Sequence, residues 1–452
     1  MRRVGACALA LVAALAAGDA GRARPARAQN LLPPNILIIV TDDQRPTGMS
    51  EVMPKTDRIF GMRGTDFKNA YATTPLCCPS RASIFTGRYA HNHGVRTNRD
   101  GELFDPRSSI QRYLKENRYR TGIFGKYILG QPLSANPPYF DEWAIFQRSP
   151  GSYHNGEWNV NGTVQRIPEY STDYIADQAV DFIGRSEMLD IQPWMMFLTT
   201  AAPHAPFKAE RDYRDARIST WEPNPAVSEV NINDKPPYIT PERNSERKAE
   251  RTRTKQLRTL MSVDDMVGEV FRALQDVGEG RDTLAIYTSD NGFLWGEHRL
   301  IQKKVPYLPA VRVPFMLRWP GRVTEGLIDQ RLVGNIDIAP TVLDAAGINP
   351  DPEYPIDGRS LLSSYQRSRL LLEFWQETRL PSWAATKTQR YHYIEYYDES
   401  GGVLYREFYD LATDPWQLVN LYGDRSTAND PDPTPLAQEL ARDRVCVGPT
   451  CP

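Results

Sequence analysis

Two adjacent cysteines, Cys77 and Cys78, stand at the predicted start of a short helix in the stretch PLCCPSRASIFTGRY. Pro79 suits the first helical turn, and Gly87 suits the left-handed residue that ends a helix. The free N–H groups at a helix N-terminus stabilise anions and lower the pKa of a thiol, and Arg81 could point toward the same anion. The stretch therefore indicates a reactive cysteine beside an anion-binding site. The alternative is an ordinary buried helix start with two packed thiols.

Two other segments end in groups that bind hard cations. NILIIVTDDQ is an apolar run that ends in Asp42 and Asp43, and TLAIYTSDNG repeats the design with Asp290 and Asn291. Such runs are typical of buried parallel strands whose carboxyl ends open into a site. Three carboxylates and one carboxamide form an oxygen-rich set suited to calcium or magnesium. Either pair alone would more often be a solvated turn or a helix cap, but two pairs together favour a metal site.

The elements that would carry these groups fit an α/β architecture. The chain has 452 residues, 40% of them hydrophobic, which is enough for one large domain with a smaller one attached. Between Leu257 and Leu274, apolar residues recur at helical spacing and lead into the second apolar strand. Residues 210–253 are rich in charge and proline and are expected to form a surface loop, either a substrate rim or an excursion without function. After Ser360, alternating tyrosines predict short strands of a C-terminal subdomain.

Residues 1–28 have the features of a secretory signal. Met-Arg-Arg is followed by an apolar run, residues 4–17, that is too short to span a bilayer, and the letters ARA at 26–28 form a small-x-small cleavage site. A short membrane anchor and twin-arginine export are the alternatives. We therefore expect a secreted or periplasmic protein with no membrane segment after signal removal.

The net charge of the chain limits the kinds of binding partner that are expected, and its last two cysteines indicate the redox compartment. The formal net charge of −2 becomes −6 once the signal, with its five arginines and one aspartate, is removed. A mildly acidic protein does not collect polyanions through its overall field, so no nucleic acid is expected and any anionic substrate must be held by local cations. Cys446 and Cys451 lie close enough in sequence to close a small disulfide loop in an oxidising compartment.

The segment from Cys77 to Arg88 matches the type I sulfatase signature C-x-P-S-R-x-x-x-x-T-G-R, and the chain is identified as a member of this formylglycine-dependent family. Further matches follow in the family's order over nearly the whole mature chain: TDDQ at the first strand end, GKY, PHAPF, SDNG and FYDLATDPWQLVNL. CCPSR, RYAHNHGV and DPWQL look most like the branch that includes N-acetylglucosamine-6-sulfatases. The resemblance implies an alkaline-phosphatase-like α/β fold, with a large, mostly parallel central sheet flanked by helices and a small C-terminal antiparallel sheet.

The resemblance also implies a chemistry for one of the two cysteines. In sulfatases, a separate formylglycine-generating enzyme oxidises the first cysteine of the motif to an aldehyde, whose hydrate is the nucleophile. Cys77 would be that residue, and Cys78, at the variable position, would be a packed free thiol. An ordinary hydroxyl that attacked sulfur would be left as a stable sulfate ester, whereas a geminal diol can expel sulfate by returning to the aldehyde. Calcium, in preference to magnesium, would contact the modified side chain and be held by Asp42, Asp43, Asp290 and Asn291.

Charged residues also occupy the positions at which the family carries its sulfate-binding and proton-transfer side chains. Arg81 would hold the nucleophile in its charged form, and the sulfate-binding and proton-transfer residues of the family map onto Lys126, His204 and Lys303. The bound substrate would be a sulfated saccharide or another small sulfate ester.

The chain departs from the family pattern at two positions. Counting back from the Val-Pro pair that follows places Lys303, and not Lys304, on the catalytic lysine, and Leu308 then replaces the usual glutamate. Ile128 stands where many sulfatases carry a histidine near the nucleophile. A histidine of RYAHNHGV could compensate, and His93 is slightly favoured over a structural role.

These inferences divide the chain into a signal at 1–28, a sulfatase catalytic domain at 29–365 and a C-terminal subdomain at 366–452. The expected function is hydrolysis of sulfate esters. A phosphonate or phosphate diester hydrolase of the same superfamily is the alternative among enzymes, and a non-catalytic glycan-binding protein is the alternative from another class. The Thr-Gly-Arg at the end of the signature favours a sulfate ester over a phosphonate or phosphate diester as the substrate. The presence of every expected metal ligand argues against a protein that has lost catalysis.

Overall fold

The computed structural model describes residues 33–147, 153–188, 191–242, 245–377 and 379–452. The predicted signal lies outside this part of the chain. The strands are β1 Asn35–Thr41, β2 Thr65–Tyr71, β3 Arg120–Lys126, β4 Glu142–Phe146, β5 Gly156–Val160, β6 Thr163–Ile167, β7 Trp194–Thr199, β8 Thr283–Ser289, β9 Phe315–Arg318, β10 Leu327–Gly334, β11 Arg369–Phe374, β12 Ser382–Thr388, β13 Tyr391–Tyr397 and β14 Val403–Asp410. The α-helices are α1 Met49–Val52, α2 Pro54–Thr56, α3 Cys77–Thr86, α4 Ala90–His93, α5 Ile110–Glu116, α6 Ser171–Glu187, α7 Ser245–Asp276, α8 Leu308–Val311, α9 Ile338–Ala346 and α10 Pro433–Asp443.

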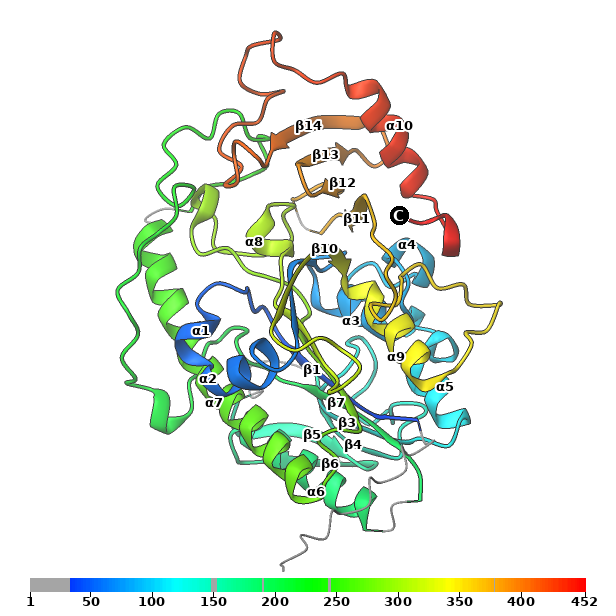
Figure 1. Cartoon of the computed structure of the whole chain (residues 1–452). Helices are drawn as coiled ribbons and strands as arrows, with labels where there is room; N and C mark the ends of the chain where they lie inside the picture. The colour runs from blue at the N-terminus through cyan, green and yellow to red at the C-terminus, as the bar shows by residue number, and fades with distance from the viewer. Residues whose placement is uncertain (1–32, 148–152, 189–190, 243–244, 378) are drawn as a thin grey trace, which may run out of the picture. The chain divides into compact units, whose positions relative to one another are not determined.

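The central sheet has the strand order β10-β2-β9-β8-β1-β7-β3-β4-β5-β6. Figure 1 labels β10, β1, β7, β3, β4, β5 and β6 of this sheet. The middle of the sheet is parallel, because β1 pairs in parallel with both β8 and β7, and β3 pairs in parallel with β7 and β4. Antiparallel pairs flank this core: β8 with β9, β9 with β2, β4 with β5 and β5 with β6. The predicted α/β class and both apolar strands are confirmed.

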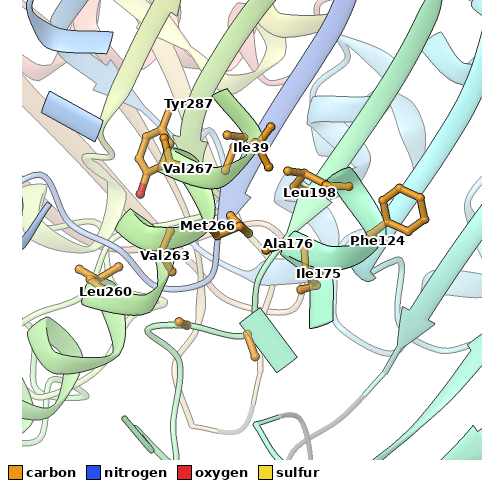
Figure 2. Close-up of a cluster of buried hydrophobic side chains, with 14 of the residues drawn as sticks. Ile39, Phe124, Ile175, Ala176, Leu198, Leu260, Val263, Met266, Val267 and Tyr287 are labelled. Carbon is orange, nitrogen blue, oxygen red and sulfur yellow. The ribbon is translucent and has the colours of Figure 1, made fainter. Parts of the chain in front are cut away.

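Helices cover both faces of this sheet. Leu37 and Ile39 of β1 pack in one cluster with α6 and α7, whereas Ile36, Ile38 and Val40 pack in a second cluster with α3, α5 and α9. In Figure 2 the first of these layers includes Ile39, Phe124, Ile175, Ala176, Leu198, Leu260, Val263, Met266, Val267 and Tyr287. A strand buried on both faces needs an apolar side chain at every position, which explains the continuous apolar run of β1.

A separate antiparallel sheet follows in the order β11-β12-β13-β14. Its last two strands confirm those predicted from the alternating tyrosines, and the predicted disulfide between Cys446 and Cys451 is present after α10. The division of the chain at residue 365 stays a prediction.

The charged stretch at 210–253 differs from its prediction at one end. Helix α7 begins at Ser245, so the last part of the expected loop is helical. At the buried position 253 the helix carries an arginine, which pairs with Glu51, and not an apolar residue. The apolar spacing that predicts a helix in the sequence therefore starts later than the helix itself.

Among the helices of the described residues, none combines the length and the apolar character needed to cross a bilayer.

Candidate active site

Neighbouring parallel strands deliver most of the predicted site residues to one edge of the sheet. The carboxyl ends of adjacent parallel strands meet at the same edge, where an α/β fold binds its ligands. The side chains found there are Asp42 and Asp43 after β1, Lys126 at the end of β3, His204 in the turn that follows β7, and Asp290 and Asn291 after β8.

Helix α3 brings Cys77 to this edge. The helix begins at Cys77 itself and not at Pro79, and it ends at Thr86; the φ of 69° at Gly87 confirms the left-handed cap. The Sγ atom of Cys77 lies 2.8 Å from Nζ of Lys303 and 3.5 Å from Oδ1 of Asp42. These two contacts put the cysteine between a cation and a carboxylate.

The surroundings of Cys77 do not make its thiol acidic. The residue is 2% exposed, and burial raises the pKa of the thiol to about 11, with the Asp42 carboxylate adding to the rise. The expected lowering of this pKa at the helix N-terminus is therefore wrong. Desolvation and a neighbouring negative charge outweigh the helix end and the nearby lysines.

Arg81 connects α3 to the strand ends. Its Nε donates to Oδ2 of Asp290 at 3.0 Å, and its Nη1 donates to the backbone carbonyl of Lys126 at 2.5 Å. Its buried Nη2 lies 3.8 Å from Oδ2 of Asp42 and has no hydrogen-bond partner within the described residues. A buried guanidinium with a free N–H is suited to receive an anionic ligand.

Two lysines form buried ion pairs with the carboxylates after β1. Lys126 pairs with Asp42, and Lys303 pairs with Asp43. Burial alone would lower the pKa of Lys303, but Asp43 and the other site acids raise it well above its usual value, and Asp42 raises the pKa of Lys126 in the same way. Burial alone would raise the pKa of Asp42, yet the surrounding cations lower it far below its usual range. Both lysines and Asp42 are therefore charged at neutral pH.

The two adjacent lysines point to different places. Lys303 reaches Cys77 and is 8% exposed, whereas Lys304 pairs with Glu377. The backbone of Lys304 has a left-handed φ of 80°, and its carbonyl accepts a hydrogen bond from Nε1 of Trp383 at 2.8 Å. The structure thus places Lys303 at the site, as the register predicts, and Lys304 outside it.

The donor atoms after β1 and β8 fit a hard cation. Ligand atoms of Asp42, Asp43, Cys77 and His204 lie within 4.8 Å of one another. Nδ2 of Asn291 donates to Oδ1 of Asp43 at 2.7 Å, while its buried Oδ1 has no hydrogen-bond partner among the described residues. A buried amide oxygen without a donor is costly unless a cation or water satisfies it. Carboxylate and amide oxygens are the ligands that calcium prefers.

Asp290 occupies a different position from the other two aspartates. Its Oδ2 accepts the Arg81 bond, and its Oδ1 accepts a hydrogen bond from the backbone N–H of Asp43 at 3.2 Å. Burial raises the pKa of Asp290, and the charge of Asp42 raises it further. Asp290 lies outside the set of four mutually close ligand atoms, and its role as a direct ligand stays a prediction.

His204 lies at the more exposed side of the cluster. Its Nδ1 lies 2.7 Å from the carbonyl oxygen of Ala205, and its Nε2 lies 3.7 Å from Oδ2 of Asp43. Its side chain is 31% exposed, in contrast to the buried lysines. His204 is therefore the member of this cluster that solvent reaches most easily.

His93 is engaged elsewhere. Its Nε2 lies 3.1 Å from Oγ of Ser83, and its Nδ1 accepts a hydrogen bond from the backbone N–H of Val95 at 3.1 Å. Burial lowers the pKa of His93 to about 3, and the neighbouring cations Arg88 and His91 add to the effect. The imidazole therefore stays neutral and links α3 to the chain that follows it. We do not propose it as the base.

Sequence reasoning missed three residues that hold the site together. The hydroxyl of Ser80 donates to the carbonyl oxygen of Asp290, and Nδ2 of Asn335 donates to Oγ of Ser80 at 2.9 Å. Gln256 of α7 donates to the carbonyl oxygen of Pro203 at 3.1 Å. The signature contains Ser80, and Gln256 is a polar residue beside the apolar face of its helix. Nothing in the sequence around Asn335 distinguishes it.

Comparisons with known proteins identify the family of the chain. The family model described as Sulfatase matches residues 34–348, and a model described as N-sulphoglucosamine sulphohydrolase, C-terminal, matches residues 296–442. Human N-acetylglucosamine-6-sulfatase is 30% identical, with a match over 92% of this chain and 86% of the relative. Extracellular sulfatase homologues of Caenorhabditis elegans and Drosophila melanogaster are 34% and 35% identical over 76% and 77% of this chain. The chain spans only 52% and 33% of the lengths of these two relatives.

Solved structures share the fold. A protein in complex with its substrate D-glucosamine-2-N,6-O-disulfate has a TM-score of 0.73 and 23% identity, and the match covers 90% of this chain and 96% of that one. Phosphonate monoester hydrolase of Agrobacterium radiobacter has a TM-score of 0.67 and 22% identity, over 90% and 95% of the two chains. The family model covers well over half of the sequence and the human relative matches nearly all of it, so the chain belongs to the sulfatase family.

Proposed function

We propose that this protein hydrolyses sulfate esters of saccharides, with a nucleophile made from Cys77 by oxidation to formylglycine and with a bound calcium ion. The observation that carries the proposal is the position of Cys77, whose Sγ lies 2.8 Å from Nζ of Lys303 and 3.5 Å from Oδ1 of Asp42 at the start of α3. A hydrated aldehyde at this position has two hydroxyls on one carbon, so that one can attack sulfur and the other can drive the release of sulfate.

The cations around Cys77 suit the charge of the reaction. A sulfate ester brings a negative charge to the site, and the alcohol leaves with more negative charge on its oxygen. Lys126, Lys303 and the free N–H of Arg81 would bind the sulfate oxygens. His204, which is partly exposed, would give a proton to the departing alcohol.

The metal would be held by Asp42, Asp43, Asn291 and the modified Cys77, with Asp290 as a further ligand or as the anchor of Arg81. Calcium bound there would supply Lewis-acid stabilisation of the charge on the sulfate ester. The carboxylates also fix Lys126 and Lys303 through their ion pairs.

The relatives guide the choice of substrate and location. Human N-acetylglucosamine-6-sulfatase and a structure bound to a glucosamine disulfate both point to a sulfated saccharide. Relatives named as extracellular sulfatases and the signal predicted at residues 1–28 support secretion. The direct test is a screen of defined sulfated saccharides and an aryl sulfate for sulfate release, and no release from any of them would contradict the proposal.

Modification is expected at Cys77 and not at Cys78. Co-expression with the formylglycine-generating enzyme should give an aldehyde at position 77 in the tryptic peptide Asn69–Arg81, with the second thiol intact, because Cys77 is the first cysteine of the signature and Cys78 stands at its variable position. Fragmentation by mass spectrometry locates the change. Active protein with two intact thiols would contradict the formylglycine mechanism.

Removal of the metal is expected to abolish turnover, and calcium should restore it. Asp42→Asn removes a carboxylate from the proposed ligand set and should weaken calcium binding, measured by calorimetry, together with sulfate release. Asp282→Asn is the matched control, because this exposed aspartate lies at the opposite end of β8. Full activity of chelator-treated, metal-free protein would show that calcium is not required.

A phosphonate or phosphate diester hydrolase remains the second candidate, because the fold is shared with a phosphonate monoester hydrolase. Comparing kcat/KM for an aryl sulfate, an aryl phosphonate monoester and a phosphodiester decides between the two. The third possibility, a glycan-binding protein without catalysis, predicts saccharide binding with no release of sulfate by protein that carries the modified residue.

A further inference from the structure

A cleft with a basic wall is lined by residues that are close in sequence to proposed site residues. It has a volume of about 320 Å³ and is lined by Phe207, Ile301 and one side of α7. The α7 residues that line it include Lys248, Arg251 and Lys255, which are exposed. The proposed catalytic residues are not among its lining residues, so the cleft is a separate feature.

The residues that line this cleft are linked to the proposed site by hydrogen bonds or by closeness in sequence. Phe207 belongs to the turn of His204, since its N–H donates to the His204 carbonyl oxygen at 3.2 Å. Ile301 precedes Lys303 by two positions. Lys255 is followed by Gln256, which donates to the carbonyl oxygen of Pro203 at the start of the same turn. A ligand held at Cys77 could therefore extend along these walls into the cleft.

The cleft carries positive charge, whereas the net charge of the whole protein is negative. Lys248 pairs with Glu242, which also lines the cleft. Arg251 and Lys255 pair with no carboxylate within the part of the chain that the structure describes, so two uncompensated positive charges face the cleft. Since the whole chain carries a formal net charge of −2, these cations are a local feature and not part of a general positive field.

The cleft combines these cations with apolar surface. Phe207 and Ile301 are half-buried, and the Phe207 ring lies 6.3 Å from the ring of Phe293. The apolar face of a sugar ring packs well against such side chains, while sulfate or carboxylate substituents of the sugar would meet Arg251 and Lys255. The volume of about 320 Å³ lies at the lower end of the range of small-molecule sites.

We propose that this cleft binds a second anionic group of the substrate, a sulfate or carboxylate on a sugar next to the one being desulfated. The preferred substrate is then a saccharide with several negative charges. This inference rests on the proposed sulfatase function, since the first anionic group is the sulfate ester at Cys77.

The test measures the affinity of a heparin tetrasaccharide, which carries several sulfates and carboxylates, by calorimetry at physiological salt. The double variant Arg251→Gln/Lys255→Gln should raise its Kd roughly five- to thirtyfold, as expected for two charge-assisted contacts at a partly exposed site. The matched control Arg272→Gln/Arg281→Gln removes the same charge from exposed positions at the far end of α7 and beyond it, and should leave the Kd unchanged.

Hydrolysis of a small aryl sulfate is measured on the same proteins. This substrate has no second anionic group, so its kcat/KM should be the same in the double variant as in the unaltered enzyme. Equal tetrasaccharide affinity in the double variant and the unaltered protein, equal weakening in the control, or no binding at all would overturn the assignment of the cleft. Absence of aryl sulfate hydrolysis by modified protein would instead contradict the proposed function, whatever the tetrasaccharide result.

Discussion

Replacement of Lys303 by alanine is expected to lower the turnover rate by about two to three powers of ten, as for other groups that stabilise charge in a transition state. Nζ of Lys303 lies 2.8 Å from Sγ of Cys77, where the sulfate would react, and the ion pair with Asp43 holds it there. Negative charge grows as the sulfur–oxygen bond to the alcohol breaks. The effect should therefore fall mainly on kcat and less on KM.

Lys304→Ala is the matched control, because it removes the same side chain one position along. Lys304 pairs with Glu377, and its loss should change the rate by no more than about threefold, which is typical of a partly exposed ion pair. Initial rates with an aryl sulfate are measured on protein whose Cys77 modification and thermal unfolding match the unaltered enzyme. Equal losses in the two variants, or a larger loss in Lys304→Ala, would contradict the assignment.

The site residues that lie at strand ends, and the end of α3, could be predicted from the order of residues around them. The apolar runs of β1 and β8 end in carboxylates, and because the two strands are parallel neighbours, Asp42, Asp43, Asp290 and Asn291 had to meet at one edge. The left-handed Gly87 fixes the end of α3 in the same local way.

Properties that depend on three-dimensional surroundings could not be predicted in this way. The helix N-terminus alone suggests an acidic thiol at Cys77, but complete burial beside Asp42 reverses the direction of the pKa shift. The position of His93 shortly after the signature suggested a base, whereas its ring nitrogens are used by Ser83 and Val95. The first outcome depends on Asp42, which approaches from the end of β1, and the second on how α3 and α4 pack, and neither is visible in the local sequence pattern.

Conversion of Cys77 to serine is expected to stop repeated turnover while leaving the surrounding site assembled. Serine is close in size to cysteine, and Lys303, Asp42 and Arg81 keep their other partners. The serine hydroxyl can still attack the sulfate ester, but it has no second hydroxyl on the same carbon to expel sulfate. The Cys77→Ser protein, with its serine unmodified, should therefore release at most one equivalent of alcohol and remain sulfated at position 77.

The measurement is the intact mass of the Cys77→Ser protein after incubation with an aryl sulfate, followed by peptide mapping. Cys78→Ser is the matched control and should keep turning over, because only position 77 contacts Lys303 and Asp42. A trapped sulfate ester is stronger evidence than loss of activity, since it requires an intact sulfate site and a nucleophile in the correct place. Sustained turnover by protein verified to carry unmodified serine would show that the second hydroxyl is unnecessary, and the diol mechanism would then be wrong.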